Sequence, residues 1–267
     1  MPRDNMIIEK IWTGNAYRNF NYLIVCPDTG ETLAIDPLDH QQCLNIANEN
    51  NWKITQILNT HDHWDHIGGN KAIVNATSAK IIAHANAKDQ IPNMDRGVTH
   101  GEVIKVGKSV ELECLDTPGH TMSHVCLLSH TDTPALFSGD TLFNAGAGNC
   151  HNGGNPQELY KTFADQLDRL PLHTEIFPGH DYLINNLAFT LDREPENKFA
   201  EKLLIAHKGK DPTTIVTTIG EEKNINAFFR LQNPGIIEKL RESFKDLDLH
   251  PSPETVFLKL RELRNHW

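Results

Sequence analysis

Three histidines and two aspartates fall within six consecutive positions, directly after residues 54–58, whose apolar pattern is typical of a buried strand. Imidazole and carboxylate groups are common ligands of divalent metal ions. On an extended or loop backbone His61 and His63 point to the same side, whereas Asp65 and His66 enter the next turn and can point toward a second centre. So many coordinating groups would crowd one another unless bound cations compensated for it. The run therefore predicts a site for two metal ions.

Three further ligand-capable side chains each follow the end of an expected strand, in a short segment rich in turn residues. Loops at strand ends are common places for functional sites. The predicted ligands are His61, His63 and His120 for one metal, Asp65, His66 and His180 for the other, and Asp140 as a bridge between them. Each ion then keeps room for a water molecule, as a catalytic site requires.

Most of the 15 histidines are expected to be ordinary hydrogen-bonding groups, because a single histidine in a loop is seldom a ligand. His124 lies four residues after His120 and could imitate a helical ligand pair, but residues 121–123 have the composition of a turn. We therefore interpret His124 as structural. The same interpretation applies to His84, His100, His130 and His151.

The first two thirds of the chain alternate short strands with loops and a few helices, and the remainder is helical. Expected strands cover residues 6–12, 21–26, 32–35, 54–58, 80–83, 109–115, 124–128, 135–138 and 175–177. Expected helices cover residues 39–49, 71–76, 157–170, 181–192, 195–207, 234–245 and 253–264, and the last three begin with proline, which suits a first turn. This pattern indicates a layered α+β fold with domains 1–180 and 181–267.

Composition narrows the possible classes of function. The 25 Lys and Arg against 35 Asp and Glu give a net charge of −10, which argues against binding to a phosphate backbone. No apolar stretch approaches the roughly 20 residues that cross a bilayer, and the first residues lack the pattern of a secretory signal. Five cysteines without a C-x-x-C pair suit a reducing compartment. We therefore expect a cytoplasmic protein that binds neither membrane nor nucleic acid. A monomer is expected, and the sequence leaves the oligomeric state open.

The run Thr60-His61-Asp62-His63-Trp64-Asp65-His66 resembles the T-H-x-H-x-D-H ligand motif of the metallo-β-lactamase superfamily. Within it, residues 60–70, 117–120, 137–143 and 178–186 resemble the hydroxyacylglutathione hydrolase (glyoxalase II) family, and the similarity covers nearly the whole chain. The resemblance implies a four-layer αβ/βα sandwich followed by a helical domain. It also implies a dinuclear metal site, with zinc preferred and iron or manganese possible, and hydrolysis of S-D-lactoylglutathione to D-lactate and glutathione.

The resemblance also suggests contacts for the glutathione part of a thioester. Tyr182 matches a substrate-binding tyrosine of the family. Arg261 and Arg264 resemble a basic pair that grips the glycine carboxylate, and a cationic pair suits that group. Without the family context, the two arginines would equally suit the dipole at the C-terminus of a helix.

One segment departs from the family pattern. Asn149 and His151 stand where the family usually carries a basic and an aromatic substrate contact, within a stretch that extends to Gly154. Each position loses a charge or a ring contact. The affinity for glutathione, or the identity of the thiol carrier, is therefore open at this point.

A thioester suits such a site on chemical grounds. Metal binding lowers the pKa of water from about 15.7 to about 7, so a metal-bridging hydroxide is the expected nucleophile. A thiolate leaves readily because the pKa of a thiol is about 8.5, so no separate acid is needed. Asp62, which lies between two predicted ligands, is expected to orient a ligand or the hydroxide.

Three other interpretations remain. A hydrolase of the same superfamily could act on another thioester, a lactone or a lactam. An iron protein with redox or oxygen chemistry would omit ligands of the second metal or replace a histidine by a carboxylate, which His63, Asp65 and His66 argue against. A metal-stabilised binding protein would have a closed coordination shell and no hydrolytic activity.

Overall fold

The structure is a computed structural model that describes residues 6–267, and these residues form two compact units. The first unit comprises residues 6–117, Ser123–Gly139 and Phe177–Asp181, and the second comprises Pro118–Met122, Asp140–Ile176 and Tyr182–Trp267. The chain therefore passes between the units several times. The division into domains 1–180 and 181–267 stays a prediction. Residues 1–5, on which the expected lack of a signal peptide partly rests, lie outside the described residues.

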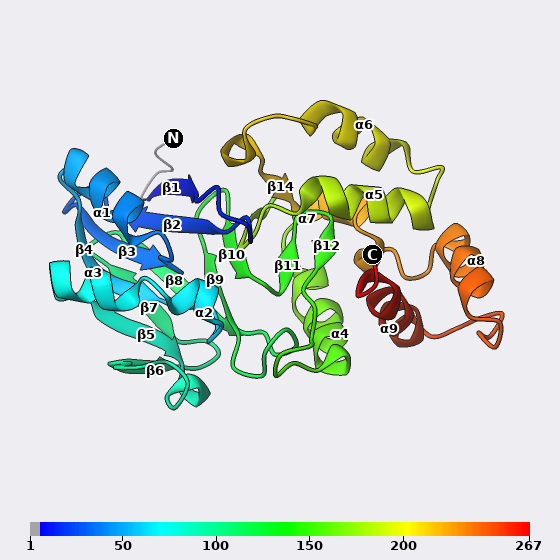
Figure 1. Cartoon of the computed structure of the whole chain (residues 1–267), viewed down its shortest axis with the longest axis horizontal. Coiled ribbons are helices and arrows are strands. Elements are labelled where there is room, and N and C mark those ends of the chain that lie inside the picture. The colour runs from blue at the N-terminus through cyan, green and yellow to red at the C-terminus, as the bar shows by residue number, and fades with distance from the viewer. Residues whose placement is uncertain (1–5) are drawn as a thin grey trace. The chain divides into compact units, whose positions relative to one another are not determined.

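The first unit contains a six-stranded sheet of order β1-β2-β3-β4-β5-β6 (Figure 1). Its strands are β1 (Ile7–Trp12), β2 (Phe20–Val25), β3 (Glu31–Ile35), β4 (Lys53–Leu58), β5 (Lys80–His84) and β6 (Arg96–Val98). The pairs among β1 to β3 are antiparallel, and those from β3 to β6 are parallel. The crossover between β3 and β4 runs through α1 (His40–Glu49), and that between β4 and β5 through α2 (Trp64–Ile67) and α3 (Asn70–Thr77). Strands β3 and β4 therefore end at the same edge of the sheet.

The strands of a second sheet that lie in this unit follow the order β13-β10-β9-β8-β7, and β13 belongs to the unit from Phe177 onward. Its strands are β7 (Val103–Val106), β8 (Val110–Asp116), β9 (Val125–Ser129), β10 (Ala135–Gly139) and β13 (Glu175–Pro178). Buried side chains of both sheets form one core, which includes Tyr22 and Leu127. A separate core on the other face of the first sheet includes Cys43 of α1, Ile57 and Ile73 of α3. The helices α1 and α3, the first sheet and the second sheet thus form three successive layers.

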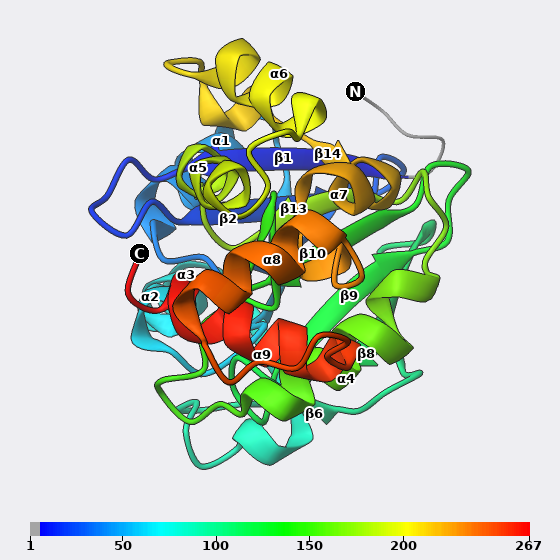
Figure 2. The same cartoon turned by 90° about the vertical axis from the view of Figure 1, so that its right-hand side faces the viewer.

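The second unit is mostly helical (Figure 2). Its elements are β11 (Leu142–Phe143), β12 (Gly146–Ala147), α4 (Pro156–Asp165), η2 (Leu167–Arg169), α5 (Leu183–Arg193), α6 (Lys198–His207), η3 (Pro212–Thr214), β14 (Thr217–Thr218), α7 (Ile219–Ile225), η4 (Ala227–Phe229), α8 (Pro234–Ser243) and α9 (Pro253–Arg264). Helix α9 contacts both α4 and α8. The rings of Phe228 and Phe163 pack on Phe257 of α9, with centroids 5.1 Å and 5.3 Å away, and form an aromatic core.

Most expected strands and helices are present, with shifts of a few residues at their ends. The helix expected over residues 157–170 ends at Asp165 and is followed by the separate turn η2. Several elements were not predicted: α2, α7, β6, β7, the hairpin of β11 and β12, and β14. All of them are short, so their side-chain periodicity gives little signal.

One of the three prolines expected to begin a helix does not do so. Pro195 lies in the loop before α6, because Asn197 caps that helix and its side chain accepts a hydrogen bond of 2.9 Å from the Ala200 backbone N–H. Pro234 and Pro253 do occupy the first turns of α8 and α9. Asparagine at the N-cap therefore outweighs a proline two residues before it as a start signal.

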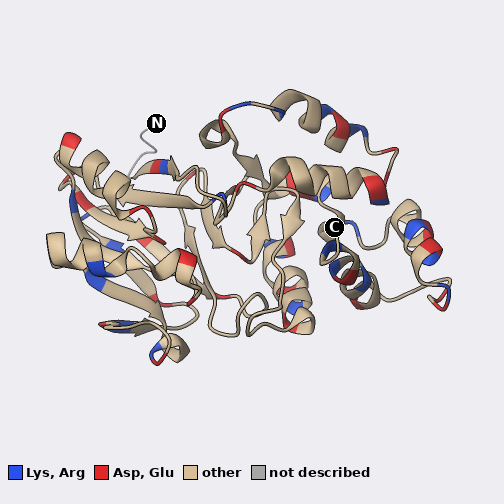
Figure 3. Cartoon of the chain, viewed as in Figure 1, with Lys and Arg blue, Asp and Glu red and all other residues tan. Residues whose placement is uncertain are grey.

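Charged residues are spread over both units (Figure 3). On α8 and α9, Lys239 pairs with Glu242 and Lys259 with Glu262, so acidic and basic groups alternate along these helices. Exposed pairs of this kind contribute little stability. All five cysteines are free thiols. Within residues 6–267, no helix is both long and apolar enough to cross a membrane.

Candidate metal centre

The histidine run lies at the end of β4 and leads into the short helix α2. His63 is the N-cap residue with extended backbone angles (φ −66°, ψ 143°), so Asp65 lies in the first turn and His66 at the end of the helix. The chain then passes close to the segment after β3, because a Cβ on Gly69 would lie 1.8 Å from the Pro37 carbonyl oxygen. Only glycine fits at this position, which accounts for the glycine three residues after His66.

His66 and His180 face each other through their Nε2 atoms, which lie 3.2 Å apart. His66 Nδ1 lies 2.9 Å from Asp36 Oδ2, and His180 Nδ1 lies 2.7 Å from the Tyr17 carbonyl oxygen. Because both acceptors take a proton from Nδ1, each neutral ring directs its Nε2 lone pair toward the other. Asp65 Oδ2 lies 3.7 Å and 3.6 Å from these two nitrogens. Three electron-pair donors converge, and this donor set fits a divalent metal ion.

His61 and His63 form a second pair in the same unit, with His61 Nε2 3.1 Å from His63 Nδ1. His61 Nδ1 lies 3.0 Å from Thr60 Oγ1, and that hydroxyl donates its own proton to Asp36 Oδ2 at 2.6 Å. The hydroxyl oxygen therefore accepts from His61 Nδ1, which leaves Nε2 as the electron-pair donor of the ring. The ring of His124 stacks on His61 with a centroid distance of 5.2 Å and holds it from one side.

Asp36 links these histidines, and the sequence did not single it out. Its backbone is left-handed (φ 47°), its Oδ1 accepts from the Thr60 backbone N–H at 2.8 Å, and its Oδ2 contacts His66. Asn19 has a similar role for Asp65, since its Nδ2 donates to Asp65 Oδ2 at 3.1 Å. One signal could have indicated Asp36: it directly follows β3, whose end adjoins the end of the parallel strand β4.

Asp62 lies between two predicted ligands. Within residues 6–267, its Oδ1 is a buried atom without a hydrogen-bond partner. Leaving a buried carboxylate oxygen unsatisfied costs free energy, so the position suits contact with a bound water or ligand atom. The orienting role expected for Asp62 stays a prediction.

In the second unit His120 and Asp140 lie beside each other, with His120 Nε2 3.6 Å from Asp140 Oδ2. His120 Nδ1 donates to the Asn149 carbonyl oxygen at 2.6 Å, which leaves Nε2 as the electron-pair donor of the ring. A Cβ on Gly148 would lie 1.8 Å from the Asp140 carbonyl oxygen. The backbone at Gly148 therefore lies directly against Asp140. The carbonyl of the next residue, Asn149, orients His120 through the hydrogen bond just described.

The five residues expected to contact substrate line one cavity of about 260 Å³ in the second unit. They are Asn149, His151, Tyr182, Arg261 and Arg264, and Phe143 and Trp267 are among the other lining residues. Tyr182 packs edge-to-face on Phe143 with a centroid distance of 5.2 Å. Two guanidinium groups beside aromatic rings suit an anionic ligand with apolar parts. The substrate-binding roles of the five residues stay predictions.

The two arginines differ in their surroundings. Arg261 is only 4% exposed, and its Nη1 donates to the carbonyl oxygens of Ala147 at 2.7 Å and Gly148 at 2.9 Å. Burial, together with the charge of Arg264, lowers the pKa of Arg261 to about 9, so it remains cationic at neutral pH. Arg264 Nη2 donates to Asn186 Oδ1 at 3.0 Å. Arg261 thus holds backbone, whereas Arg264 binds a side-chain amide.

Two family models match adjoining parts of the chain. Residues 18–180 match the metallo-beta-lactamase superfamily. Residues 181–267 match the model described as hydroxyacylglutathione hydrolase C-terminus. The two matches together extend over nearly the whole sequence.

Similar proteins and solved structures agree with the two family models. The hydroxyacylglutathione hydrolase of Polaromonas sp. (strain JS666) is 64% identical over 98% of this chain and 100% of the relative, and that of Nitrosococcus oceani is 62% identical with the same coverage. The crystal structure of ETHE1 from Myxococcus xanthus has a TM-score of 0.67 at 25% identity and covers 97% of this chain and 99% of that chain. The expected α+β fold class, with a helical C-terminal part, is confirmed.

Proposed function

From the premise that the chain belongs to the hydroxyacylglutathione hydrolase family of the metallo-beta-lactamase superfamily, we propose that it hydrolyses S-D-lactoylglutathione to D-lactate and glutathione. One observation carries the proposal: two hydroxyacylglutathione hydrolases are 64% and 62% identical to this chain over their whole length. The expected reaction is cleavage of the thioester by water, which releases a carboxylate and a thiol.

The metallo-beta-lactamase fold implies a dinuclear site for divalent metal ions. We propose zinc as the metal, with iron or manganese as alternatives. The proposed ligands are His61, His63, Asp65, His66 and His180 of the first unit and His120 and the bridging Asp140 of the second. When bound, the ions supply a hydroxide nucleophile at neutral pH and polarise the thioester carbonyl. The converging donors of Asp65, His66 and His180 support this assignment.

The residues around the ligands hold three of the histidine rings in one tautomer. Asp36 and a backbone carbonyl take the Nδ1 protons of His66 and His180, and the Asn149 carbonyl takes that of His120. In each ring Nε2 is then the atom available to a metal ion. A leaving-group acid is not required, because a thiol with a pKa of about 8.5 leaves as a thiolate near neutral pH.

For glutathione itself we propose the cavity of the second unit. Arg264 and Arg261 would supply positive charge for a carboxylate. Tyr182 would supply a phenol hydroxyl and an aromatic ring. Asn149 and His151 replace the more basic and aromatic residues of the family pattern. This cavity is cationic in a chain whose net charge is −10, which supports an anionic substrate.

We also propose that the protein is a cytoplasmic monomer that acts on a small molecule and binds no membrane or nucleic acid. The acidic composition supports the last point, because a phosphate backbone attracts basic surfaces. The unpaired cysteines support a reducing compartment.

The alternative is a hydrolase of the same superfamily that acts on another thioester, a lactone or a lactam. The deciding experiment loads the purified protein with zinc, measures bound metal by elemental analysis, and compares substrates. We expect two zinc ions per chain and a higher kcat/KM for S-D-lactoylglutathione than for other acyl thioesters, a lactone or a β-lactam. Turnover of the glutathione thioester no faster than background, with rapid cleavage of a lactone or lactam, would favour the alternative.

A further inference from the structure

The hairpin of β11 and β12 occupies the short stretch of chain between Asp140 and Asn149. Its turn contains Ala145, whose φ of 58° is a left-handed conformation that residues with a Cβ avoid. An energetically unfavourable turn persists only where surrounding contacts hold it. The contacts that hold this turn therefore help to fix the position of the hairpin, including its ends beside Asp140 and Asn149.

Glu222 of α7 contacts this turn directly. The side chain is fully buried, and its two carboxylate oxygens lie 3.1 Å and 2.9 Å from the Ala145 backbone nitrogen. Oε1 also accepts from Thr217 Oγ1 at 2.7 Å, and Oε2 accepts from Asn226 Nδ2 at 2.8 Å. An ionised carboxylate accepts only, so it matches this set of donors.

The same network reaches the residues on both sides of Ala145. Asn144 Nδ2 donates to Thr217 Oγ1 at 2.7 Å, and Asn226 Nδ2 also donates to the Gly146 carbonyl oxygen at 3.1 Å. Three consecutive hairpin residues are thus bound, directly or through one side chain, to groups that surround Glu222. Buried networks of this kind hold one backbone conformation strongly.

The far end of the hairpin adjoins both candidate metal ligands of the second unit. The Gly148 backbone N–H donates to the Thr141 carbonyl oxygen at 3.1 Å, which closes the segment next to Asp140. The following carbonyl, that of Asn149, accepts from His120 Nδ1 at 2.6 Å. A shift of the hairpin would therefore move the backbone that follows Asp140 and the group that orients His120.

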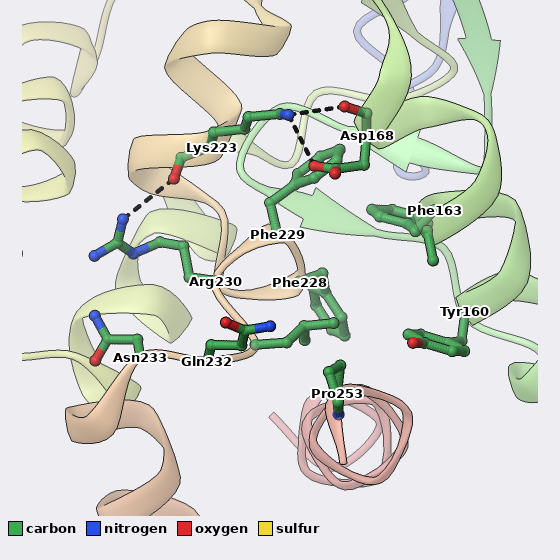
Figure 4. Close-up of a pocket in the computed structure, with 12 residues that line it drawn as sticks. Tyr160, Phe163, Asp168, Lys223, Phe228, Phe229, Arg230, Gln232, Asn233 and Pro253 are labelled. Carbon is green, nitrogen blue, oxygen red and sulfur yellow. Dashed lines mark hydrogen bonds and ion pairs between the residues drawn. The ribbon is translucent and has the colours of Figure 1, made fainter.

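The segment that carries Glu222 is itself anchored by the adjacent residue (Figure 4). Lys223 Nζ donates to the Asp168 carbonyl oxygen at 2.8 Å and lies 2.9 Å from Asp168 Oδ1. The Lys223 carbonyl oxygen accepts from Arg230 Nη1 at 3.1 Å. Glu222 thus extends from a fixed backbone toward the hairpin.

We propose that Glu222 is a positioning residue, whose carboxylate holds the β11–β12 hairpin and thereby sets the metal-binding geometry of Asp140 and His120. This inference rests on the proposed function, because it takes those two side chains as metal ligands. Glu222 itself lies outside the substrate cavity described above.

The test compares Glu222→Gln with the matched control Glu194→Gln. Glu194 is also buried and also accepts from three side chains, Asn197, Arg230 and Asn233, all outside residues 140–149. Arg230 binds Glu194 through Nε and Nη2 but the Lys223 carbonyl through Nη1, so the control does not change the contact that anchors the Glu222 segment directly. The glutamine at position 222 places an NH2 group against a donor. Measurements are made near pH 8, above the pKa of about 7 to which burial raises Glu222, so the wild-type carboxylate is ionised.

For folded Glu222→Gln we expect zinc affinity, measured by chelator competition, to fall about 10–100-fold, as for other groups that orient metal ligands. The value of kcat should fall while KM stays near that of the wild type. Glu194→Gln should lose thermal stability but keep wild-type zinc affinity and kcat. Equal zinc affinities in the two variants would overturn the proposal, whether both match the wild type or both are weakened.

A second variant covers the case in which Glu222→Gln does not fold. Thr217→Val keeps the shape of the side chain but removes the hydroxyl that links Asn144 to Glu222. This variant should also lower zinc affinity, and unchanged affinity would count against the proposal.

The two proposals can fail separately. A wild-type protein that binds two zinc ions but cleaves no glutathione thioester would refute the proposed function, while the zinc affinities would still decide the role of Glu222.

Discussion

The Nε2 atoms of His66 and His180 lie 3.2 Å apart although both rings direct their Nδ1 atoms to other acceptors. Two nitrogen lone pairs at this distance repel each other unless a positive charge lies between them. The carboxylate of Asp65 adds a third donor to the same point. Without a cation, this arrangement stores unfavourable energy in the folded state.

We therefore expect metal to stabilise the protein strongly. After removal of metal by a chelator, addition of zinc to about 100 times its Kd stabilises the native state by about 2.7 kcal/mol. For a chain of this length that corresponds to a rise in Tm of roughly 5–10 °C, measurable by thermal unfolding. Magnesium is the control, because it prefers oxygen ligands and should give little change. Equal stabilisation by both metals would contradict a histidine-rich site.

Asp36→Asn should weaken metal binding although Asp36 is not a predicted ligand. Its carboxylate accepts from Thr60 Oγ1 and from His66 Nδ1, and an amide would turn one acceptor into a donor. Loss of such an orienting group lowers metal affinity or activity about 10–100-fold. Chelator competition and kcat measure the effect, with the exposed turn residue Asp28 changed to Asn as the control. Similar zinc affinity in both variants would contradict the orienting role.

The sequence could indicate the histidines because their chemistry is concentrated and follows a recognisable strand. His61, His63 and His66 occur in one short run after β4, and the glycine at position 69 has a steric reason to be there. By contrast, Asp36 is a single acidic residue at the end of β3. Its role depends on which strand lies beside β3, and that pairing is a tertiary property.

Glu222 illustrates a different limit of sequence interpretation. It lies in α7, a seven-residue helix whose charged stretch Glu221-Glu222-Lys223 suggests a solvated surface. The structure buries Glu222 completely because Thr217, Asn226 and the Ala145 backbone N–H satisfy its oxygens. A buried carboxylate of this kind is recognised only once the distant hairpin is placed next to it. The Thr218–Glu221 capping box, with Glu221 and Glu222 in the first turn, is a local start signal for that helix.

Arg264→Ala and Arg261→Ala should have different consequences. Arg264 contacts one side-chain amide, so its removal should raise KM for a glutathione thioester about tenfold or more, as expected for a charge-assisted hydrogen bond. The value of kcat should change little. Arg261 holds the carbonyls of Ala147 and Gly148, so its removal should also lower kcat and Tm. Unchanged kinetics in both variants would show that neither arginine contacts the substrate.

Asp140→Ala should lower bound metal to well below two ions per chain and abolish hydrolysis. The reason is that a bridging carboxylate contributes to both ions, so its loss affects the pair rather than one site. Elemental analysis after zinc loading and dialysis measures the metal content. The exposed Asp132→Ala is the control for loss of one negative charge. Full activity of Asp140→Ala would rule out the bridging assignment.

The stability difference between the wild type and Glu194→Gln should depend on pH. Burial opposes ionisation of Glu194, but hydrogen bonds from Arg230, Asn197 and Asn233 outweigh it and lower its pKa. The resulting stabilisation is fully present above the unfolded pKa of about 4.3 and is lost as pH falls through the lower native value. Urea unfolding of the metal-free proteins should therefore give a large difference in free energy at neutral pH and a smaller one below about pH 4. A difference that stays constant across this range would mean that Glu194 ionises with its ordinary pKa in the folded protein.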